Sequence, residues 1–191
     1  MSADLGGRAE LESLLAADVL SVAEGLLGWT LESRVDGVVT AVTITETEAY
    51  AGPDDPASHA FGGLTPRNEV MFGPAGLLYV YRSYGIHWCM NVVVGERDLP
   101  HAVLLRGGEP TAGIASMVKR RGRRTDIANG PGKLCQALGV TGVLDGTDLR
   151  TGVLRLFPGP GIGDRIVETT PRIGISKAVD LPWRYVATTQ R

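Results

Sequence analysis

Two strand-like segments on either side of Ser83-Tyr84-Gly85 place the strongest constraint on the fold. Residues 77–82 and 86–94 both alternate between apolar and polar side chains, a pattern typical of two antiparallel strands joined by a tight turn. A two-residue turn would pair Tyr81 with Trp88 and would mix polar and apolar groups on both faces of the hairpin. A three-residue turn with Gly85 in the left-handed region separates these groups, and we predict that register.

The predicted register gives the hairpin one apolar face and one face able to contact a ligand. The apolar face carries Leu78, Val80, Ile86, Trp88 and Met90. The opposite face carries Tyr79, Tyr81, His87, Cys89 and Asn91. Because side chains alternate along a strand, a structure that placed Asn91 and Tyr81 on different faces would contradict this register.

Glycine and proline divide the rest of the chain into short elements. The 26 glycines and 11 prolines are spread along the 191 residues as turn signals, and no internal repeat, linker or low-complexity block is present. A chain of this length that is 43% apolar can bury one substantial core. We therefore predict a single domain over residues 1–191.

Periodicity predicts helices and strands on both sides of the hairpin. Helices are predicted at residues 18–27 with Gly28 at the cap, at 111–121 with Ile114, Met117 and Val118 facing inward, and at 131–138 between Pro131 and Gly139. Strands are predicted at residues 38–50 and 101–106, followed by short strands in the last third. Residues 52–74 lack any periodicity and are predicted to form a long ordered loop, a type of segment that is usually functional.

Charge is distributed unevenly along the chain. Residues 1–64 hold eleven acids and two bases (net −9), residues 65–124 four acids and nine bases (+5), and the remainder six acids and eight bases (+2). A cationic middle third can present a basic face to a polyanion although the total charge is −2. The run Lys119-Arg120-Arg121-Gly122-Arg123-Arg124 fits such a face, and it equally fits the solvated end of a helix, where basic residues complement the helix dipole.

The segment Asn129-Gly-Pro-Gly-Lys133 also has two interpretations. It does not match the phosphate-loop pattern, and no strand is predicted before it. Backbone amides at a glycine-rich helix start can still contact an anion. An ordinary turn that begins the helix at Pro131 explains the same residues equally well.

Several classes of protein are disfavoured by the sequence. No apolar stretch approaches the length of a membrane span, and residues 1–16 contain no apolar core of a signal peptide, so we expect a cytoplasmic protein without a membrane partner. Cys89 and Cys135 are then expected to be reduced and buried. His59, His87 and the two cysteines lack the spacing of a metal motif, and we predict no metal site.

Aromatic residues are concentrated in one part of the chain. Seven of the eleven lie between residues 50 and 88, namely Tyr50, Phe61, Phe72, Tyr79, Tyr81, Tyr84 and Trp88. Tyrosines close to carboxylates and arginines are suited to holding a flat heterocycle and changing its protonation or hydration. Core packing is the alternative for Tyr79, whereas Tyr84 beside the turn glycine is difficult to bury.

Two acidic residues share one face of the strand predicted at residues 38–50. Glu46 and Glu48 are two positions apart and lie on the same face as Tyr50. Mutual repulsion and partial burial can raise the pKa of one of them toward neutrality, as a general base requires. An exposed strand face that happens to carry two acids is the alternative.

Taken in order along the chain, these residues resemble the alkyladenine (methylpurine) DNA glycosylases. The resemblance covers roughly residues 14–186, and its motifs are Glu46-Thr-Glu-Ala-Tyr50, His59, Thr65-Pro-Arg-Asn68, Met71-Phe72, Leu78-Tyr-Val-Tyr81, Tyr84-Gly85, Cys89-Met-Asn91, Val103-Leu-Leu-Arg106, Glu109-Pro110, the stretch from Gly130-Pro131 to Leu138, and Arg172-Ile-Gly174.

The resemblance implies both a fold and an activity. The fold is α+β, with a mainly antiparallel curved sheet, flanking helices and a protruding hairpin, and residues 1–191 form one DNA glycosylase domain. The activity is base-excision repair without a metal or organic cofactor. A damaged purine, alkylated or deaminated, is flipped out of double-stranded DNA and its N-glycosidic bond is hydrolysed, and we expect the protein to act as a monomer.

The resemblance also assigns roles to individual residues. Glu48 corresponds to the carboxylate that activates the attacking water, and Arg106 helps to fix that water. The flipped base is held by Tyr50, His59 and Tyr81, while Asn91 crowds the exocyclic amine of guanine. Tyr84 corresponds to the wedge that fills the gap in the stack, and further DNA contacts are implied for Thr65, Arg67, Gly85, Ile86 and His87.

Cleavage of the DNA backbone by the same enzyme is not expected. A lyase would need an amine nucleophile, and residues 44–91 contain no lysine. Two other classes of function compete with the glycosylase. One is a module that binds single-stranded nucleic acid through the same aromatic residues, and the other is a hydrolase of free nucleosides.

Overall fold

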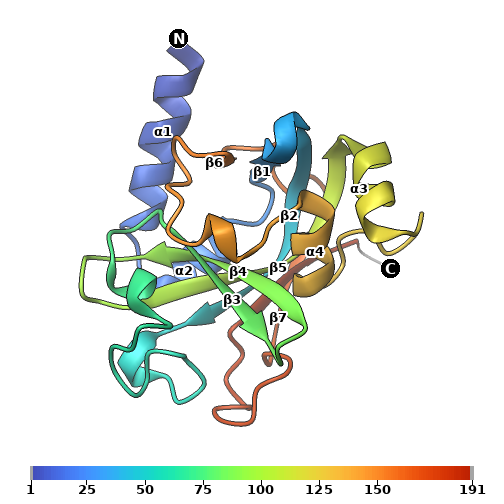
Figure 1. Ribbon diagram of the computed structural model, residues 1–191. Coiled ribbons are helices and arrows are strands. Elements are labelled where there is room, and N and C mark those ends of the chain that lie inside the picture. The colour runs from blue at the N-terminus through green and yellow to red at the C-terminus, as the bar shows by residue number, and fades with distance from the viewer. Residues whose placement is uncertain (1, 190–191) are drawn as a thin grey trace.

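An antiparallel sheet that curls into a half barrel forms the centre of the molecule (Figure 1). The computed structural model describes residues 2–189. Over these residues the strands are β1 (Thr30–Ser33), β2 (Thr40–Tyr50), β3 (Leu78–Ser83), β4 (His87–Val94), β5 (His101–Ala112), β6 (Leu154–Phe157), β7 (Ile166–Thr170) and β8 (Arg184–Thr188). The α-helices are α1 (Ser2–Leu15), α2 (Val19–Gly25), α3 (Ile114–Arg121) and α4 (Pro131–Leu138). The α+β class expected from the resemblance is confirmed.

Strand β2 joins the two parts of the sheet. The main path runs β3-β4-β5-β2-β1-β6, and β5 pairs with β2 along nearly all of its length. On its other edge β2 pairs with β1 over residues 40–43 and with β8 over residues 46–48. β7 and β8 form a hairpin whose long loop spans residues 171–183. The register of β2 against β5 shifts on both sides of Glu46, and such bulges redirect side chains.

The hairpin of β3 and β4 has the predicted register. Ser83 pairs with His87, which leaves Tyr84, Gly85 and Ile86 as a three-residue turn, and Gly85 has a φ of 68°. Side chains therefore divide between the two faces as predicted, with one exception. Ile86 was assigned to the apolar face, but it lies in the turn itself and is 67% exposed.

The helices follow their predictions closely, with two corrections. α4 has the predicted bounds, and α2 begins after Asp18, whose carboxylate accepts hydrogen bonds from two amides of the first turn. α2 ends at a cap on Leu26, two residues before the predicted cap at Gly28. In α3, Met117 is buried as predicted but Ile114 is exposed, because β5 extends to Ala112 and delays the start of that helix.

Helix α1 was not predicted from the sequence. Leu11 and Leu15, one helical turn apart, are buried in the core beneath it. Gly6, Gly7 and the acidic residues of this segment weaken the apolar pattern, which explains why the helix was missed. No described helix is long and apolar enough to cross a membrane.

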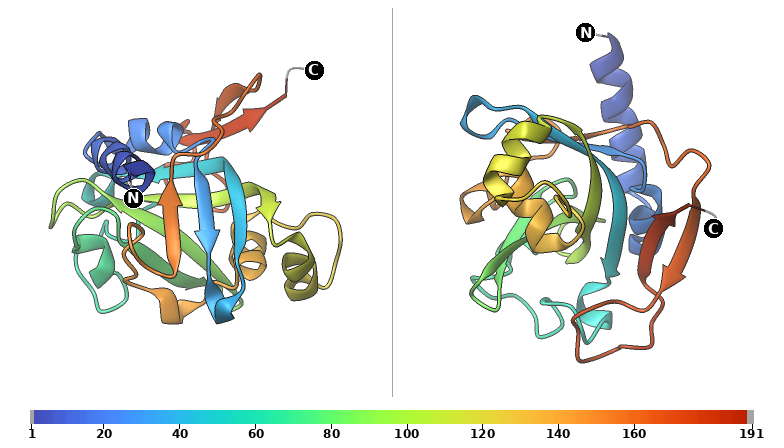
Figure 2. Two further views of the ribbon diagram at one scale, coloured as in Figure 1. Left: turned by 90° about the horizontal axis from the view of Figure 1, so that it is seen from above. Right: turned by 90° about the vertical axis from the view of Figure 1, so that its right-hand side faces the viewer.

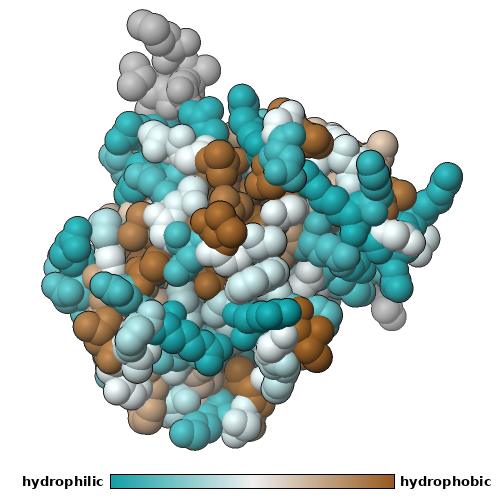
Figure 3. All heavy atoms as spheres, viewed as in Figure 1, coloured by the Kyte–Doolittle hydropathy of each residue, from teal (hydrophilic) through white to brown (hydrophobic). Residues whose placement is uncertain are grey.

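The basic run of residues 119–124 includes the last turn of α3, as one of its two interpretations predicted. Arg120 donates to the carbonyl oxygen of Ala137 at the end of α4, and Arg121 donates to the side chain of Gln136. These two arginines therefore join α3 to α4. Lys119, Arg123 and Arg124 are exposed, and Figure 3 shows mainly hydrophilic side chains on the side of the molecule where α3 lies. Cys89 and Cys135 are free and buried, as predicted.

Two long loops meet at one end of the sheet. Residues 52–74 form the predicted ordered loop, interrupted by 3-10 turns at Gly52–Asp54 and Glu69–Phe72. The loop of residues 171–183 lies beside it in both Figure 1 and Figure 2. The ammonium group of Lys177 lies 5.7 Å from the ring centre of Phe61, which links the two loops directly. Segments far apart in the sequence thus lie together at this end of the half barrel.

Candidate active site

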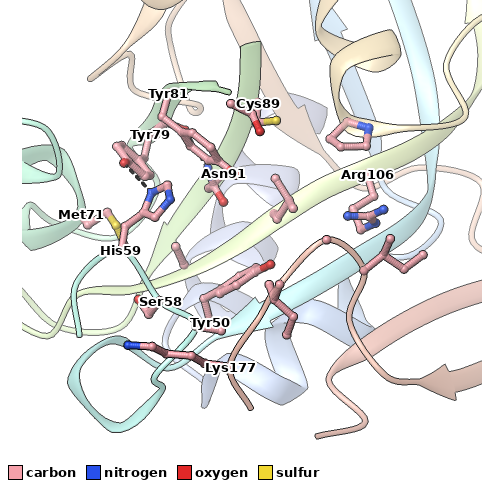
Figure 4. A pocket seen from close by; sticks show the side chains of 18 of the residues that line it. Tyr50, Ser58, His59, Met71, Tyr79, Tyr81, Cys89, Asn91, Arg106 and Lys177 are labelled. Atoms are coloured by element: carbon pink, nitrogen blue, oxygen red, sulfur yellow. Dashed lines mark hydrogen bonds between the residues drawn. The ribbon is translucent and has the colours of Figure 1, made fainter. Parts of the chain in front are cut away.

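A cavity of about 620 Å³ lies between the two loops and the sheet. Strands β2 to β5 contribute Tyr50, Tyr79, Tyr81, Cys89, Asn91 and Arg106, and the loops contribute His59, Arg67, Ile173 and Lys177. Figure 4 shows the labelled side chains of Tyr81, Asn91 and His59 facing Tyr50 across the cavity. The fold therefore brings together the predicted base-binding residues Tyr50, His59, Tyr81 and Asn91, and Arg106 with them.

Three aromatic side chains form one wall of the cavity. The rings of Tyr79 and Tyr81 stack with their centres 5.6 Å apart, and His59 meets Tyr81 edge to face at 4.4 Å. The hydroxyl of Tyr79 and Nδ1 of His59 are hydrogen bonded at 2.9 Å, while Tyr50 lies across the cavity (Figure 4). Such a slot suits a flat, aromatic ligand.

The aromatic wall carries no charge at neutral pH. Burial raises the pKa of Tyr79 to about 12 and raises those of Tyr50 and Tyr81 as well. Burial, assisted by the charge of Arg67, lowers the pKa of His59, which favours its neutral imidazole. The wall therefore offers hydroxyl and ring nitrogen groups for hydrogen bonding without repelling a cationic ligand.

Glu48 lies behind the wall of the cavity, with none of its side chain exposed, and the three residues that contact its carboxylate, Tyr50, Arg106 and Ile173, line the cavity. Its Oε1 accepts a hydrogen bond of 2.8 Å from the amide of Ile173 and lies 3.2 Å from Nη1 of Arg106. Its Oε2 accepts a hydrogen bond of 2.9 Å from the hydroxyl of Tyr50. Donors from three different segments thus hold the carboxylate in one orientation.

Arg106 connects Glu48 to its neighbour Glu46. The Nε of Arg106 donates to Oε1 of Glu46 at 2.7 Å, and Arg184 on β8 donates to the same oxygen at 2.7 Å. Glu46, Glu48 and Tyr50 therefore share one face of β2, as predicted. Arg184 was not predicted as part of the site, because only the pairing of β8 with β2 brings it there.

The two carboxyl groups have opposite pKa shifts. For Glu48 burial is the largest influence, and it raises the pKa despite the opposing charge of Arg106. Burial also raises the pKa of Glu46, but hydrogen bonds from Arg106 and Arg184 outweigh it, so the pKa of Glu46 falls below its usual value. Repulsion by Glu46 was expected to raise the pKa of Glu48, but its influence is smaller than those of burial, Arg106, the Ile173 amide and Tyr50.

Asn91 is buried on the cavity side of β4, on the same face as Tyr81. Its amide nitrogen donates to the carbonyl oxygen of Tyr79 at 3.1 Å, which fixes the orientation of the side chain. Figure 4 shows the amide oxygen pointing into the cavity. Asn91 therefore presents a rigid polar group at the inner wall.

Of the residues expected to contact DNA, Tyr84 and Arg67 line the cavity, whereas Thr65, Gly85, Ile86 and His87 do not. Tyr84 at the hairpin tip lines the mouth and is 87% exposed, with a φ of 49°. Arg67 reaches over the ring of Tyr81 at 5.7 Å, while Thr65 is bound to the side chain of Asn68 and shapes the loop. His87 is exposed beside Gly132 of α4 and does not line the cavity.

The loop of residues 171–183 supplies residues to the site for which the sequence predicted no role. Ile173 and Lys177 line the cavity, and Arg172 lies behind it. Residues 44–91 contain no lysine, but they do not form the whole cavity, because the fold brings Lys177 to it. The motif Arg172-Ile-Gly174 was the one signal that pointed to this loop. Among the described side chains of residues 6–189, no three His, Cys, Asp or Glu groups are placed to hold a metal ion.

Known proteins are similar in sequence to this chain over most of its length. Residues 13–191 match the family described as methylpurine-DNA glycosylase (MPG). The chain is 53% identical over 180 residues to a protein of Agrobacterium fabrum, 51% over 175 residues to one of Rhodopseudomonas palustris, and 50% over 176 residues to one of Methanoculleus marisnigri. These matches cover 91%, 91% and 88% of this chain and 86%, 84% and 89% of the relatives. The names of all three describe them as candidate 3-methyladenine DNA glycosylases.

The opposite pKa shifts predict opposite effects of two matched substitutions on stability. Ionised Glu48 destabilises the folded state at pH 7, so Glu48→Gln is expected to raise the melting temperature, whereas Glu46→Gln is expected to lower it. Changes of about 2–4 °C correspond to 1 kcal/mol in a domain of this size. Thermal denaturation of both variants at several pH values tests this.

The pH dependence of these two effects has a defined sign. The advantage of Glu48→Gln is present above the raised pKa of Glu48 and is lost as the pH falls through that value. The contribution of Glu46 is present above the usual pKa of a glutamic acid and is lost as the pH falls through its lowered value. Two shifts of the same sign at pH 7 would contradict the assignment.

Proposed function

The chain belongs to the methylpurine-DNA glycosylase family of base-excision repair enzymes, and on that premise we propose how it acts. It extrudes an alkylated or deaminated purine, 3-methyladenine among them, from double-stranded DNA. It then hydrolyses the N-glycosidic bond with a water activated by Glu48 and leaves an abasic site. The observation that carries this proposal is a buried, oriented carboxylate held directly behind the wall of an aromatic cavity by three residues that line it.

The aromatic slot is suited to an extruded purine. Extrusion costs a few kcal/mol, and the cost is lowest for damaged or mispaired bases. Stacking of a base on an aromatic side chain contributes about 1–3 kcal/mol, so Tyr50 and Tyr81 on opposite sides of the cavity can offset it. His59 supplies a hydrogen-bonding edge, and its neutral state does not oppose a purine made cationic by alkylation.

Glu48 is the general base in this proposal. An alkylated purine is already a good leaving group because it carries positive charge, so the reaction needs mainly an activated and positioned water. The raised pKa of Glu48 makes its carboxylate a stronger base than an exposed one, and Arg106 beside it helps to hold the water. Glu46 remains ionised and balances the charges of Arg106 and Arg184. No step requires a metal or an organic cofactor.

The mouth of the cavity is suited to a DNA duplex. The exposed side chain of Tyr84 projects from the hairpin tip, where it can fill the gap left by the extruded base. Gly85, Ile86 and His87 follow it and would meet the minor groove, while Thr65 and Arg67 on the neighbouring loop would contact the strand. One chain supplies all of these groups, which supports action as a monomer.

We propose that the enzyme hydrolyses the N-glycosidic bond and does not cleave the DNA backbone. A lyase would need an unprotonated amine beside the sugar carbon that is attacked. Lys177 is the lysine that lines the cavity, but its ammonium group lies over Phe61 and points away from Arg106 in Figure 4. Water activated by Glu48 is therefore the nucleophile.

Glu48→Gln tests the proposed base. The substitution keeps the shape of the side chain, so binding of lesion DNA is expected to remain, while excision falls by about 10²-fold or more. The measurement is single-turnover excision from a duplex that contains one lesion, followed by alkali to cleave abasic sites. The lesion is the one that the wild type releases fastest among 3-methyladenine, 7-methylguanine, hypoxanthine and ethenoadenine.

Glu46→Gln is the matched control for that experiment, and a smaller loss of excision is expected because Glu46 acts only through the arginines. Near-normal excision by Glu48→Gln would overturn the assignment. A protein that only binds nucleic acid would give no strand breaks after alkali, and a nucleoside hydrolase would cleave free nucleosides with little dependence on DNA.

Asn91→Ser tests how guanine is excluded. The rigid amide of Asn91 is expected to collide with the exocyclic amine of guanine, so a shorter side chain should admit guanine-type bases. Excision of adenine-type lesions is expected to remain largely intact. The ratio of guanine-type to adenine-type excision is the measurement, and an unchanged ratio would contradict exclusion by Asn91.

Tyr84→Ala tests the proposed wedge. Loss of one stacked aromatic side chain is expected to weaken the complex with the extruded base by about 1–3 kcal/mol, with little change in melting temperature because Tyr84 is exposed. The loss should be smaller when the lesion lies opposite a gap or mismatch, since extrusion is then easier. Equal losses in paired and unpaired contexts would show that Tyr84 does not act as a wedge.

A further inference from the structure

A buried ion pair joins the two loops behind the cavity. Arg172 donates through Nη1 to Oδ2 of Asp55 at 2.5 Å and through Nη2 to Oδ1 at 2.8 Å, and neither side chain is exposed to solvent. Asp55 belongs to the loop of residues 52–74, and Arg172 to the loop of residues 171–183. The two-pronged geometry fixes the guanidinium plane as well as its position.

Further contacts tie Arg172 to strand β2. Its Nη1 also donates to the carbonyl oxygen of Ala49 at 2.9 Å. Its guanidinium lies between two aromatic rings, 4.7 Å from the centre of Tyr50 and 5.0 Å from that of Trp183. Ala49 stands between Glu48 and Tyr50 in the sequence, so Arg172 is attached to the strand at the point that carries both site residues.

The next residue in the chain touches the proposed base. The amide of Ile173 donates to Oε1 of Glu48 at 2.8 Å. Because this amide nitrogen is bonded directly to the carbonyl carbon of Arg172, the contacts of Arg172 determine where the amide lies. Arg172 also packs on Tyr50, whose hydroxyl donates to the other carboxylate oxygen of Glu48.

From these contacts we propose that Arg172, held by Asp55, is a positioning residue for base excision. It sets the Ile173 amide against Glu48 and the Tyr50 ring against the cavity, and it touches neither the reacting water nor the base. This inference rests on the proposed function of Glu48 as the base. A buried ion pair is a poor source of net stability compared with apolar packing, so orientation of the site is the role that its geometry serves.

Loss of this arrangement has a predictable effect on Glu48. The charged or titratable groups that act on its carboxyl are Glu46 and Tyr50 on β2, Tyr81 on β3, Cys89 on β4 and Arg106 on β5, together with the Ile173 amide. Of these, only the Ile173 amide and Tyr50 are held by Arg172. Because an N–H donor stabilises a carboxylate, displacing the amide makes Glu48 harder to ionise.

The test is the pH dependence of single-turnover excision under saturating enzyme for Arg172→Lys and Asp55→Asn. Both variants are expected to lose about tenfold or more in rate at the optimum, because the catalytic groups are misplaced. Both are also expected to move the acid limb of the profile to higher pH by about one unit. The second variant keeps the test meaningful if the first does not fold.

Arg150→Lys is the matched control. Arg150 also pairs with an aspartate, Asp148, and donates to a backbone oxygen, that of Ala75, but it lies outside the cavity. The Arg150 pair is partly exposed, so this variant should lose less thermal stability than Arg172→Lys, and it should keep the wild-type pH profile. If Arg172→Lys and Asp55→Asn resemble Arg150→Lys, with no shift of the acid limb, the pair is merely structural and the inference is wrong.

The variant Glu48→Gln separates this inference from the proposed function. An inactive Glu48→Gln together with an unmoved acid limb in the Arg172 and Asp55 variants would overturn the positioning role alone. An active Glu48→Gln would overturn the general base, and the positioning role with it.

Discussion

Removing the Glu48 carboxylate from solvent requires hydrogen-bond donors, and these come from parts of the chain that lie far apart. Tyr50 belongs to the same strand, Arg106 to β5, and the Ile173 amide to the loop between β7 and β8. An unpaired buried carboxylate would be very costly, so each of these segments must reach its place for the site to be stable. The curled sheet and the pairing of β8 with β2 are what bring them together.

The same strand gives its two glutamates different chemical roles. Glu46 is surrounded by the cations of Arg106 and Arg184, and its pKa falls. Glu48 is buried more deeply, and its pKa rises. Pairs of titratable groups whose environments move their pKa values apart are typical of acid–base sites. Arg106 lowers the pKa of both carboxyl groups, so the difference comes from the deeper burial of Glu48 and from Arg184, which pairs with Glu46.

Local patterns predicted the parts of the fold that depend on neighbouring residues. The register of β3 against β4 followed from separating polar from apolar side chains, and α4 from its proline and glycine boundaries. Strand periodicity placed Glu46, Glu48 and Tyr50 on one face of β2, and the family resemblance then singled out Glu48 as the expected base. Helix α1 was missed because glycines and acids obscure its apolar stripe, and Ile114 was misplaced because pairing with β2 carries β5 into the predicted helix. Arg172, Lys177 and Arg184 reach the site only through long-range strand pairing, which a local pattern does not contain.

Glu46 and Glu48 lie on one strand, yet burial raises the pKa of Glu48 while two arginines lower that of Glu46. The most direct test is a ¹³C NMR titration of the side-chain carboxyl groups, with Glu46→Gln and Glu48→Gln used to assign the two signals. We expect Glu48 to titrate above the ordinary value of 4.5 and Glu46 below it. A Glu48 signal that titrates at or below the ordinary value, with Glu46 above it, would contradict this account.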